Sequence, residues 1–330
     1  MKFFIKIFKS LKSKGFIGFI IAINLDLIGV IVRKLHRVRD YYTLYKFHNY
    51  ASQQSTLIVI LAGYKSYLWA STLKSIVKYQ PNNVDVCIVS AGLNDEKLLR
   101  FCESNKWSYL STSRNSPGIA LNKAIELHPQ ADFIYKLDED IIVGPDFFEK
   151  LLEGYKYTHK NSLLEPGFVA PVLNVNGVSY AILLRALGLE KQYEEIFGQI
   201  VSKCGDLPVH YDPEAAWWLW KNTLPFKEKS LNLSKSGISY TVCPTRFSIG
   251  AILFRREFIE QIGGLKSSWY TGVLGVDEDE LCKDCVSASR PIYIINNVLA
   301  GHFSFFPQEK FMKSKLSEMA MIDPDSFSVK

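Results

Sequence analysis

The sequence contains little cysteine for its length. Its 330 residues include six scattered cysteines, namely Cys87, Cys102, Cys204, Cys243, Cys282 and Cys285. Disulfide-stabilised secreted domains are small and dense in cysteine, so this pattern argues against that class and favours reduced thiols. Cys282 and Cys285 form a CxxC pair, but no second pair follows at zinc-ribbon spacing, so we interpret both as ordinary helix positions.

The main body of the chain has almost no net charge. Residues 1–40 contain nine Lys and Arg against two Asp, which gives 9 − 2 = +7, whereas the whole chain carries +6. The rest therefore sums to 6 − 7 = −1. This distribution argues against nucleic-acid binding by the main body and predicts an anionic partner at the N-terminus.

The chain also lacks an apolar run long enough to span a bilayer comfortably. The run from Phe16 to Val32 is interrupted by Asn24 and Asp26, whereas a spanning helix needs about 20 apolar residues and tolerates a carboxylate poorly. If the preceding segment forms a helix, its lysines lie on one side, which is typical of a helix in the membrane interface. The basic cluster that follows favours a cytoplasmic flank.

We therefore predict that residues 1–50 associate peripherally with the cytoplasmic face of the cell membrane. A true span over residues 16–32 and a secretory signal are the alternatives. We find no convincing small-residue cleavage site for a signal.

Hydrophobic residues make up 48% of the chain, enough for a substantial core. Apolar runs predict strands at 55–63, 84–92, 107–112 and 131–137, and the segments between and after them predict helices at 66–79, 94–105, 118–128 and 145–156. This alternation predicts an α/β fold with a mostly parallel sheet flanked by helices. Ligands of such sheets bind beyond the carboxyl ends of the strands.

Three consecutive carboxylates follow the fourth predicted strand. Asp138, Glu139 and Asp140 end the segment "YKLDED". Adjacent carboxylates repel each other unless a cation or hydrogen-bond donors compensate them. Asp138 and Asp140 would face the same side if the strand continued, so both could address one divalent ion. The alternative is a solvated acidic turn.

Several segments in order resemble the family 2 nucleotide-sugar glycosyltransferases of the GT-A fold. "YKLDED" with "IIVGPDFFEKL" resembles their Asp-x-Asp segment, and "LIVILAGYKSYLWASTLKSIVKYQ" their first strand and helix. "SRNSPGIALNKAI", "FSIGAILFRREFIEQIGGLKSSW", "GVLGVDEDELC" and "AGHFSFF" resemble later family segments. The resemblance covers roughly residues 55 to 305 and implies a GT-A, Rossmann-like mixed sheet. The ordered set is more specific than any single motif.

The resemblance implies a divalent cation, Mn²⁺ or Mg²⁺, that neutralises the leaving diphosphate of a nucleotide-sugar donor. Its implied protein ligands are Asp138, Asp140 and His302, although a lone histidine is often structural. The implied donor-binding residues are Ala62, Gly63, Tyr64, Arg114, Asn115, Asp138 and Glu139. The turn from Ser90 to Asp95 lacks the usual carboxylate of the family's nucleotide-base pocket, so the resemblance does not identify the base of the donor nucleotide. Uridine diphosphate is expected because it is the commonest nucleotide in the family.

The general base is expected in the acidic run "DEDE". The family usually shows Glu-Asp here, whereas this chain has Asp277-Glu278, an inverted pair. The candidates are therefore Asp277, Glu278 and Asp279, with the first two preferred. Carboxylates at a helix N-terminus, where the macrodipole favours them, are the alternative explanation.

The resulting hypothesis is a hexosyltransferase-type glycosyltransferase (EC 2.4) of surface polysaccharide biosynthesis. It would act, with inversion, on a glycan or lipid-linked oligosaccharide acceptor. The expected domain, 51–310, comprises a nucleotide-sugar-binding half, 51–150, and an acceptor-binding half, 151–310, followed by a tail, 311–330. The indoles of Trp217, Trp218 and Trp220 are expected in the core more often than at the acceptor. A nucleotidyltransferase and a non-catalytic glycan- or nucleotide-binding membrane scaffold are the alternatives.

Overall fold

The computed structural model describes residues 38, 42–202, 206–266 and 275–328. By internal contacts the chain divides into two units, Met1–Leu44 and Tyr45–Lys330, and the second contains all the strands and helices described below. Tyr45–His48, within the range 1–50 predicted to associate with a membrane, instead form β1 of the sheet. Most of the rest of that range lies outside the described residues. Within them, no helix is both long and apolar enough to cross a bilayer.

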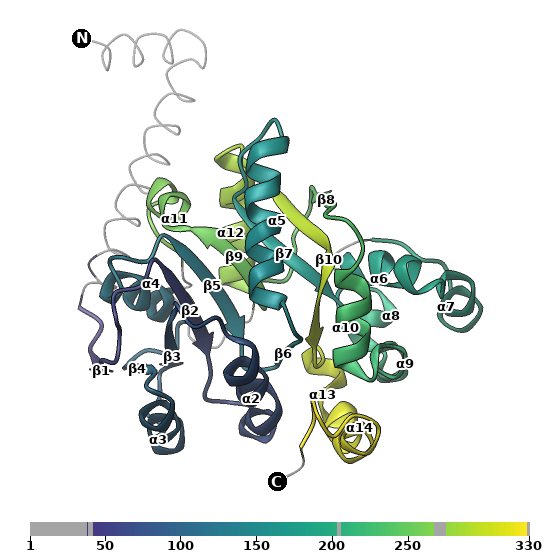
Figure 1. The fold of residues 1–330 in the computed structure, drawn as a ribbon, viewed down its shortest axis with the longest axis horizontal. Coiled ribbons are helices and arrows are strands. Elements are labelled where there is room, and N and C mark those ends of the chain that lie inside the picture. The colour runs from purple at the N-terminus through teal and green to yellow at the C-terminus, as the bar shows by residue number, and fades with distance from the viewer. Residues whose placement is uncertain (1–37, 39–41, 203–205, 267–274, 329–330) are drawn as a thin grey trace, which may run out of the picture. The chain divides into compact units, whose positions relative to one another are not determined.

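One ten-stranded sheet organises the second unit (Figure 1). The strand order is β1-β4-β3-β2-β5-β9-β7-β10-β6, and β8 pairs with β10. Pairing directions make β2, β3, β4, β5, β7 and β10 run the same way, with the other strands opposed. The strands are β1 Tyr45–His48, β2 Thr56–Leu61, β3 Asp85–Ala91, β4 Ser108–Thr112, β5 Phe133–Asp138, β6 Ile141–Val143, β7 Phe168–Leu173, β8 Tyr240–Cys243, β9 Ala251–Arg255 and β10 Ile292–His302.

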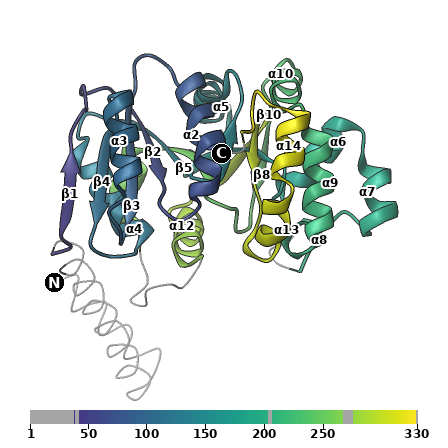
Figure 2. The same ribbon diagram turned by 90° about the horizontal axis from the view of Figure 1, so that it is seen from below.

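Helices cover both faces of this sheet. Figures 1 and 2 place α2 and α5 on one face and α4 and α12 on the other. The α-helices are α2 Trp69–Tyr79, α3 Glu96–Asn105, α4 Pro117–Leu127, α5 Phe147–Asn161, α6 Ser179–Leu187, α7 Glu190–Phe197, α8 Pro208–Tyr211, α9 Pro213–Thr223, α10 Phe226–Ser234, α11 Arg256–Ile262, α12 Val276–Ser287, α13 Glu309–Ser314 and α14 Leu316–Ile322. Two 3₁₀ turns, η1 Ser66–Leu68 and η2 Phe306–Gln308, precede α2 and α13.

The predicted α/β class with a mostly parallel, helix-flanked sheet is confirmed. The four predicted strands correspond to β2 to β5, and the predicted helices to η1 with α2 and to α3, α4 and α5. The central strands are buried on both faces, with Leu57–Ile60 and Cys87–Val89 fully inaccessible to solvent. Continuous apolar runs of this kind are typical of parallel strands covered by helices.

Short helices fill most of the chain between β7 and β8. α6 to α10 occupy most of residues 179–234, and the indoles of Trp217 and Trp220 are buried. Trp220 donates to the Phe303 carbonyl at 2.9 Å, and a Cβ on Gly301 would lie 2.3 Å from its ring. The expectation that these indoles belong to the core holds for Trp217 and Trp220.

The described cysteines are all buried and unpaired in disulfides: Cys87, Cys102, Cys243, Cys282 and Cys285. Cys282 and Cys285 lie on α12, as predicted for ordinary helix positions. Burial raises the pKa of Cys102 and of Cys282 to about 12 in each case, so neither thiol is reactive at neutral pH.

Candidate active site

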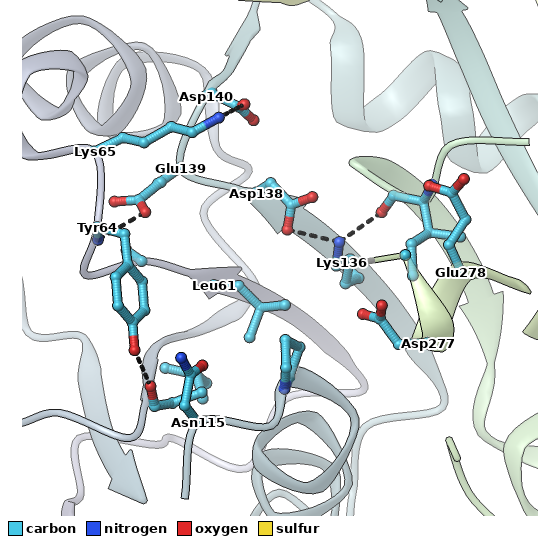
Figure 3. Close-up of a pocket in the computed structure, with 16 residues that line it drawn as sticks. Leu61, Tyr64, Lys65, Asn115, Lys136, Asp138, Glu139, Asp140, Asp277 and Glu278 are labelled. Atoms are coloured by element: carbon cyan, nitrogen blue, oxygen red, sulfur yellow. Dashed lines mark hydrogen bonds and ion pairs between the residues drawn. The ribbon is translucent and has the colours of Figure 1, made fainter. Parts of the chain in front are cut away.

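A pocket of about 280 Å³ opens where β2, β3 and β5 end, beside the start of α12 (Figure 3). This is the place that parallel-sheet topology predicts for a ligand. The lining includes most of the predicted site residues: Ala62, Tyr64, Asn115, Asp138, Glu139, Asp140, Asp277 and Glu278. The other predicted residues, Gly63, Arg114, Asp279 and His302, are not part of this lining.

Glu139 holds the loop that follows β2. Its carboxylate accepts the backbone N–H groups of Gly63 at 3.0 Å and Tyr64 at 2.9 Å. It also accepts the indole N–H of Trp69 at 2.6 Å. Three donors on one buried carboxylate fix the loop geometry. Glu139 therefore positions the residues expected to bind the donor, and its own contact with a ligand stays a prediction.

The side chain of Tyr64 extends along the pocket from Glu139 toward Asn115 (Figure 3). The Tyr64 hydroxyl donates to the Ala91 carbonyl at 2.7 Å, while the side chain is 58% exposed. Gly92 has φ +77°, and a Cβ there would lie 2.6 Å from the backbone of Asn115, so only glycine allows the two loops to approach. An exposed aromatic ring held in this way can stack on a planar base.

Arg114 and Asp95 form hydrogen bonds with neighbouring residues of the chain. The Arg114 carbonyl accepts from the Thr112 hydroxyl at 3.1 Å and from the Ser116 N–H at 3.0 Å. Asp95 caps α3 by accepting the N–H groups of Lys97 and Leu98. The contact of the Arg114 side chain with a donor stays a prediction.

Asp138 is paired with a buried lysine, Lys136, which was not among the predicted site residues. The ammonium of Lys136, only 2% exposed, donates to Asp138 Oδ1 at 2.6 Å and to the Ile249 carbonyl at 2.7 Å. Partial burial raises the pKa of Asp138, whose side chain is 36% exposed, to about 6; Asp140 and Asp277 act in the same direction and Lys136 opposes them. The signal was present in the sequence, because a residue two positions before Asp138 on a strand faces the same side.

Asp140 faces a different pair of residues. Its Oδ2 accepts from Lys65 at 2.6 Å and lies 3.7 Å from His302 Nε2. Burial alone would raise the pKa of Asp140, but the ammonium of Lys65 lowers it below its usual value. The expected common orientation of Asp138 and Asp140 is not observed, because β5 ends at Asp138 and the strand alternation ends with it.

The Asp140–His302 pair suits two ligands of one cation. Nδ1 of His302 lies 2.7 Å from the Val175 carbonyl, which can only accept, so Nδ1 carries the proton and the Nε2 lone pair faces Asp140. Asp140 Oδ2 and His302 Nε2 lie 3.7 Å apart, which is too far for a hydrogen bond. Both atoms can nevertheless bind one ion that lies between them, with bonds of about 2.1 Å. Within the described residues, no three His, Cys, Asp or Glu side chains form a metal site by themselves.

The charge of the pocket also favours a cation. Its lining has two ammonium groups and five carboxylates, and Arg246 forms an ion pair with one of these carboxylates, Glu278, so the sum is 3 − 5 = −2. A diphosphate would be repelled by such a surface unless a cation lay between them. Mg²⁺-type ions use one or two protein carboxylates and complete their shell with water and substrate phosphates. The residues present therefore fit this group.

The three acids at the start of α12 have different environments. Glu278 forms an ion pair with Arg246 and accepts the Ile249 N–H at 3.3 Å, and Asp279 lies 2.8 Å from Arg246 Nη1. Asp277 has no such partner among the described residues, and its carboxylate points into the pocket toward Lys136 (Figure 3). Asp277 is therefore the acid whose lone pairs are available to a ligand.

A second pocket, of about 310 Å³, adjoins the first. Glu278 lines both, and Arg246 lines only the second. Aromatic and polar groups share the second lining, which also includes Asn176, Gly177, Val178, His210, Ser248, Phe305, Phe306 and Pro307. Phe306 is 76% exposed. Exposed rings beside hydrogen-bonding groups suit the faces and hydroxyls of sugars.

No protein-family model and no curated protein matches the sequence. Among solved structures, the chain is similar to GalNAc-T7 crystallised with UDP, GalNAc and Mn²⁺, at 14% identity and a TM-score of 0.47. That likeness covers 77% of this chain and 45% of the other, so this chain spans less than half of that structure's length. It is also similar to the mannosyltransferase PcManGT from Pyrobaculum calidifontis in complex with GDP-Man and Mn²⁺, at 14% identity and a TM-score of 0.46, covering 90% and 71%.

Proposed function

We propose that the protein is a metal-dependent glycosyltransferase that uses a nucleoside-diphosphate sugar, with uridine diphosphate as the expected nucleotide. The main support is the Asp140–His302 pair, in which Asp140 Oδ2 and His302 Nε2 lie 3.7 Å apart and Asp140 lines a pocket of excess negative charge. Ordered segments that resemble family 2 of the GT-A fold give further support. A bound divalent cation would neutralise charge on the departing diphosphate.

The residues of the pocket take complementary roles in this proposal. Asp140 and His302 hold the cation, with Asp138 beside them, and the loop fixed by Glu139 presents Tyr64 to the nucleotide base. The acceptor hydroxyl gives its proton to Asp277 while its oxygen bonds to the anomeric carbon and the carbon–oxygen bond to the diphosphate breaks. A single displacement of this kind inverts the anomeric configuration.

The second pocket supports a glycan as the acceptor. It lies against Glu278, next to Asp277, and combines an exposed phenylalanine with polar side chains. A sugar ring on Phe306 would bring its hydroxyls to the border of the donor pocket. The proposed product is an extended surface glycan or lipid-linked oligosaccharide.

Calorimetric titration with uridine diphosphate, with and without Mn²⁺, tests the donor site. We expect Mn²⁺-dependent binding that Asp140→Asn abolishes and the matched exposed variant Asp325→Asn retains, with both folds intact by circular dichroism. No binding of any nucleoside diphosphate would contradict the proposal. Preference for a nucleoside triphosphate with release of pyrophosphate would favour a nucleotidyltransferase, and ligand binding without turnover of any donor would favour a scaffold.

Peripheral membrane association is proposed from the sequence of residues 1–50. Basic and apolar side chains there suit an anionic membrane surface. Deleting residues 1–40 should move the protein from the membrane fraction to the supernatant and lower activity on a lipid-linked acceptor. Activity on a soluble acceptor should persist, and unchanged membrane recovery would contradict the proposal.

A further inference from the structure

The ammonium group of Lys65 lies where a cation would approach Asp140. It is 2.6 Å from Asp140 Oδ2, the oxygen that His302 Nε2 also faces. Lys65 follows the strand β2 in the loop held by Glu139 and lines the donor pocket. The ammonium and the carboxylate are at ion-pair distance, and the Asp140 side chain is 8% exposed.

We infer that Lys65 is an exchangeable counter-ion of Asp140, which it leaves for the donor diphosphate when a divalent cation binds. The inference rests on the proposed function of the pocket. It assigns Lys65 two opposed effects: the ammonium competes with the cation for Asp140, and it attracts the phosphate groups of the donor.

Electrostatics require this exchange of partners. A buried carboxylate such as Asp140, 5% exposed, needs a positive partner in the absence of a metal ion. Once a divalent ion binds Oδ2, an ammonium group at hydrogen-bond distance from the same oxygen would be strongly repelled. Diphosphate oxygens at the cation offer that ammonium a new acceptor in the same pocket.

Lys65 can move, whereas Lys136 cannot. The Lys65 side chain is 25% exposed, and Asp140 is its one hydrogen-bond partner among the described residues. Lys136 is 2% exposed and donates to both Asp138 and Ile249 from within β5. A lysine on a flexible stem at a pocket wall changes partner at little cost, while one held by two buried acceptors stays in place.

Calorimetry on the full-length protein tests the inference through Lys65→Met. The first titration uses Mn²⁺ alone, and the second uses uridine diphosphate at saturating Mn²⁺. We expect the variant to bind Mn²⁺ about tenfold more tightly and uridine diphosphate about tenfold more weakly. Misfolding would weaken both interactions, so the opposite signs are specific to the exchange. The matched control is Lys156→Met on α5, an exposed lysine that should change neither constant.

The outcomes separate this inference from the proposed function. Wild-type protein that binds no nucleoside diphosphate contradicts the proposed function. Wild-type protein that binds uridine diphosphate, with a Lys65→Met variant whose Mn²⁺ affinity is unchanged, weaker or undetectable, overturns the inference alone. If Lys65→Met does not fold by circular dichroism, Lys65→Gln removes the same charge and provides the same test. Lys65→Arg keeps the charge and should retain wild-type Mn²⁺ affinity.

Discussion

Lys136 and Asp138 form an ion pair between two residues of the same strand, with 2.6 Å between the ammonium and Oδ1. The lysine is almost fully buried and the aspartate is 36% exposed. A buried ammonium without a partner is costly, so this pair sets both the orientation of Asp138 and the charge of the pocket floor. Donor recognition in the proposed enzyme thus depends on a residue that lies beneath the acidic motif.

Replacing Lys136 with methionine should lower stability. The change leaves the Ile249 carbonyl without its donor and Asp138 without its counter-ion. Because Asp138 is partly exposed to water, we expect a loss of about 1–2 kcal/mol in the free energy of unfolding, which is less than for a fully buried pair. Urea denaturation measures this loss.

A double-mutant cycle with Asp138→Asn isolates the pair. The double variant should lose less stability than the sum of the two single changes. Additive losses would contradict a stabilising interaction between Lys136 and Asp138.

Replacing Glu139 with glutamine should destabilise the loop that follows β2. One amide position can still accept the Tyr64 N–H, but the NH₂ group would then face the donors of Gly63 and Trp69. Unsatisfied buried donors cost about 1–3 kcal/mol, so we expect a loss of about 2 kcal/mol in urea unfolding. The same change at exposed Glu103 should have almost no effect, and equal losses at the two sites would contradict this role of Glu139.

His128 should make the fold less stable in mild acid. Its ring is 2% exposed, Nδ1 donates to the Ala124 carbonyl at 2.7 Å, and Nε2 is buried without a partner among the described residues. Burial lowers the pKa of His128 below its usual value of 6.5. The unfolded chain then binds the proton more readily than the folded protein, so stability falls as pH drops below about 6.5.

The expected contribution of His128 is at most about 1 kcal/mol between pH 6.5 and 5.5. His128→Asn retains a donor for Ala124 and should reduce the loss of unfolding free energy over this interval. An identical slope for wild type and His128→Asn would contradict the assignment. His210, whose pKa burial also lowers, should contribute with the same sign.

Local patterns in the sequence predicted the first half of the fold well. β2 and β3 contain continuous apolar runs, and the lengths and flanking residues of β2 to β5 identify all four as strands. The residues at the ends of those strands predicted where the site lies and which acidic residues it contains. Lys136 could also have been predicted, since residues two apart on a strand face the same side.

Contacts between distant segments could not be predicted in the same way. Lys65 and Asp140 form an ion pair although they are 75 positions apart in the sequence, and Arg246 and Glu278 do so although they are 32 positions apart. No local periodicity encodes these pairs, because they depend on how β2, β5 and α12 meet at one edge of the sheet. β6 is three residues long and pairs with the distant β10, so its apolar triplet carries too little signal.

Asp277 should be essential for turnover but dispensable for donor binding. It points into the pocket without an ion-pair partner among the described residues, whereas Glu278 and Asp279 are tied to Arg246. General bases contribute about 10²- to 10⁴-fold to rate, so Asp277→Asn should lower kcat by that range and keep the Kd for uridine diphosphate within about twofold.

Asp279→Asn makes the same chemical change two residues away on α12 and serves as the matched control. It removes one contact to a half-exposed arginine, so kcat should fall less than tenfold. Steady-state rates with a donor identified by screening, beside calorimetric Kd values, distinguish the two variants. Full activity in Asp277→Asn together with loss of turnover in Glu278→Gln would instead make Glu278 the base, because Glu278 lines both the donor pocket and the adjoining one.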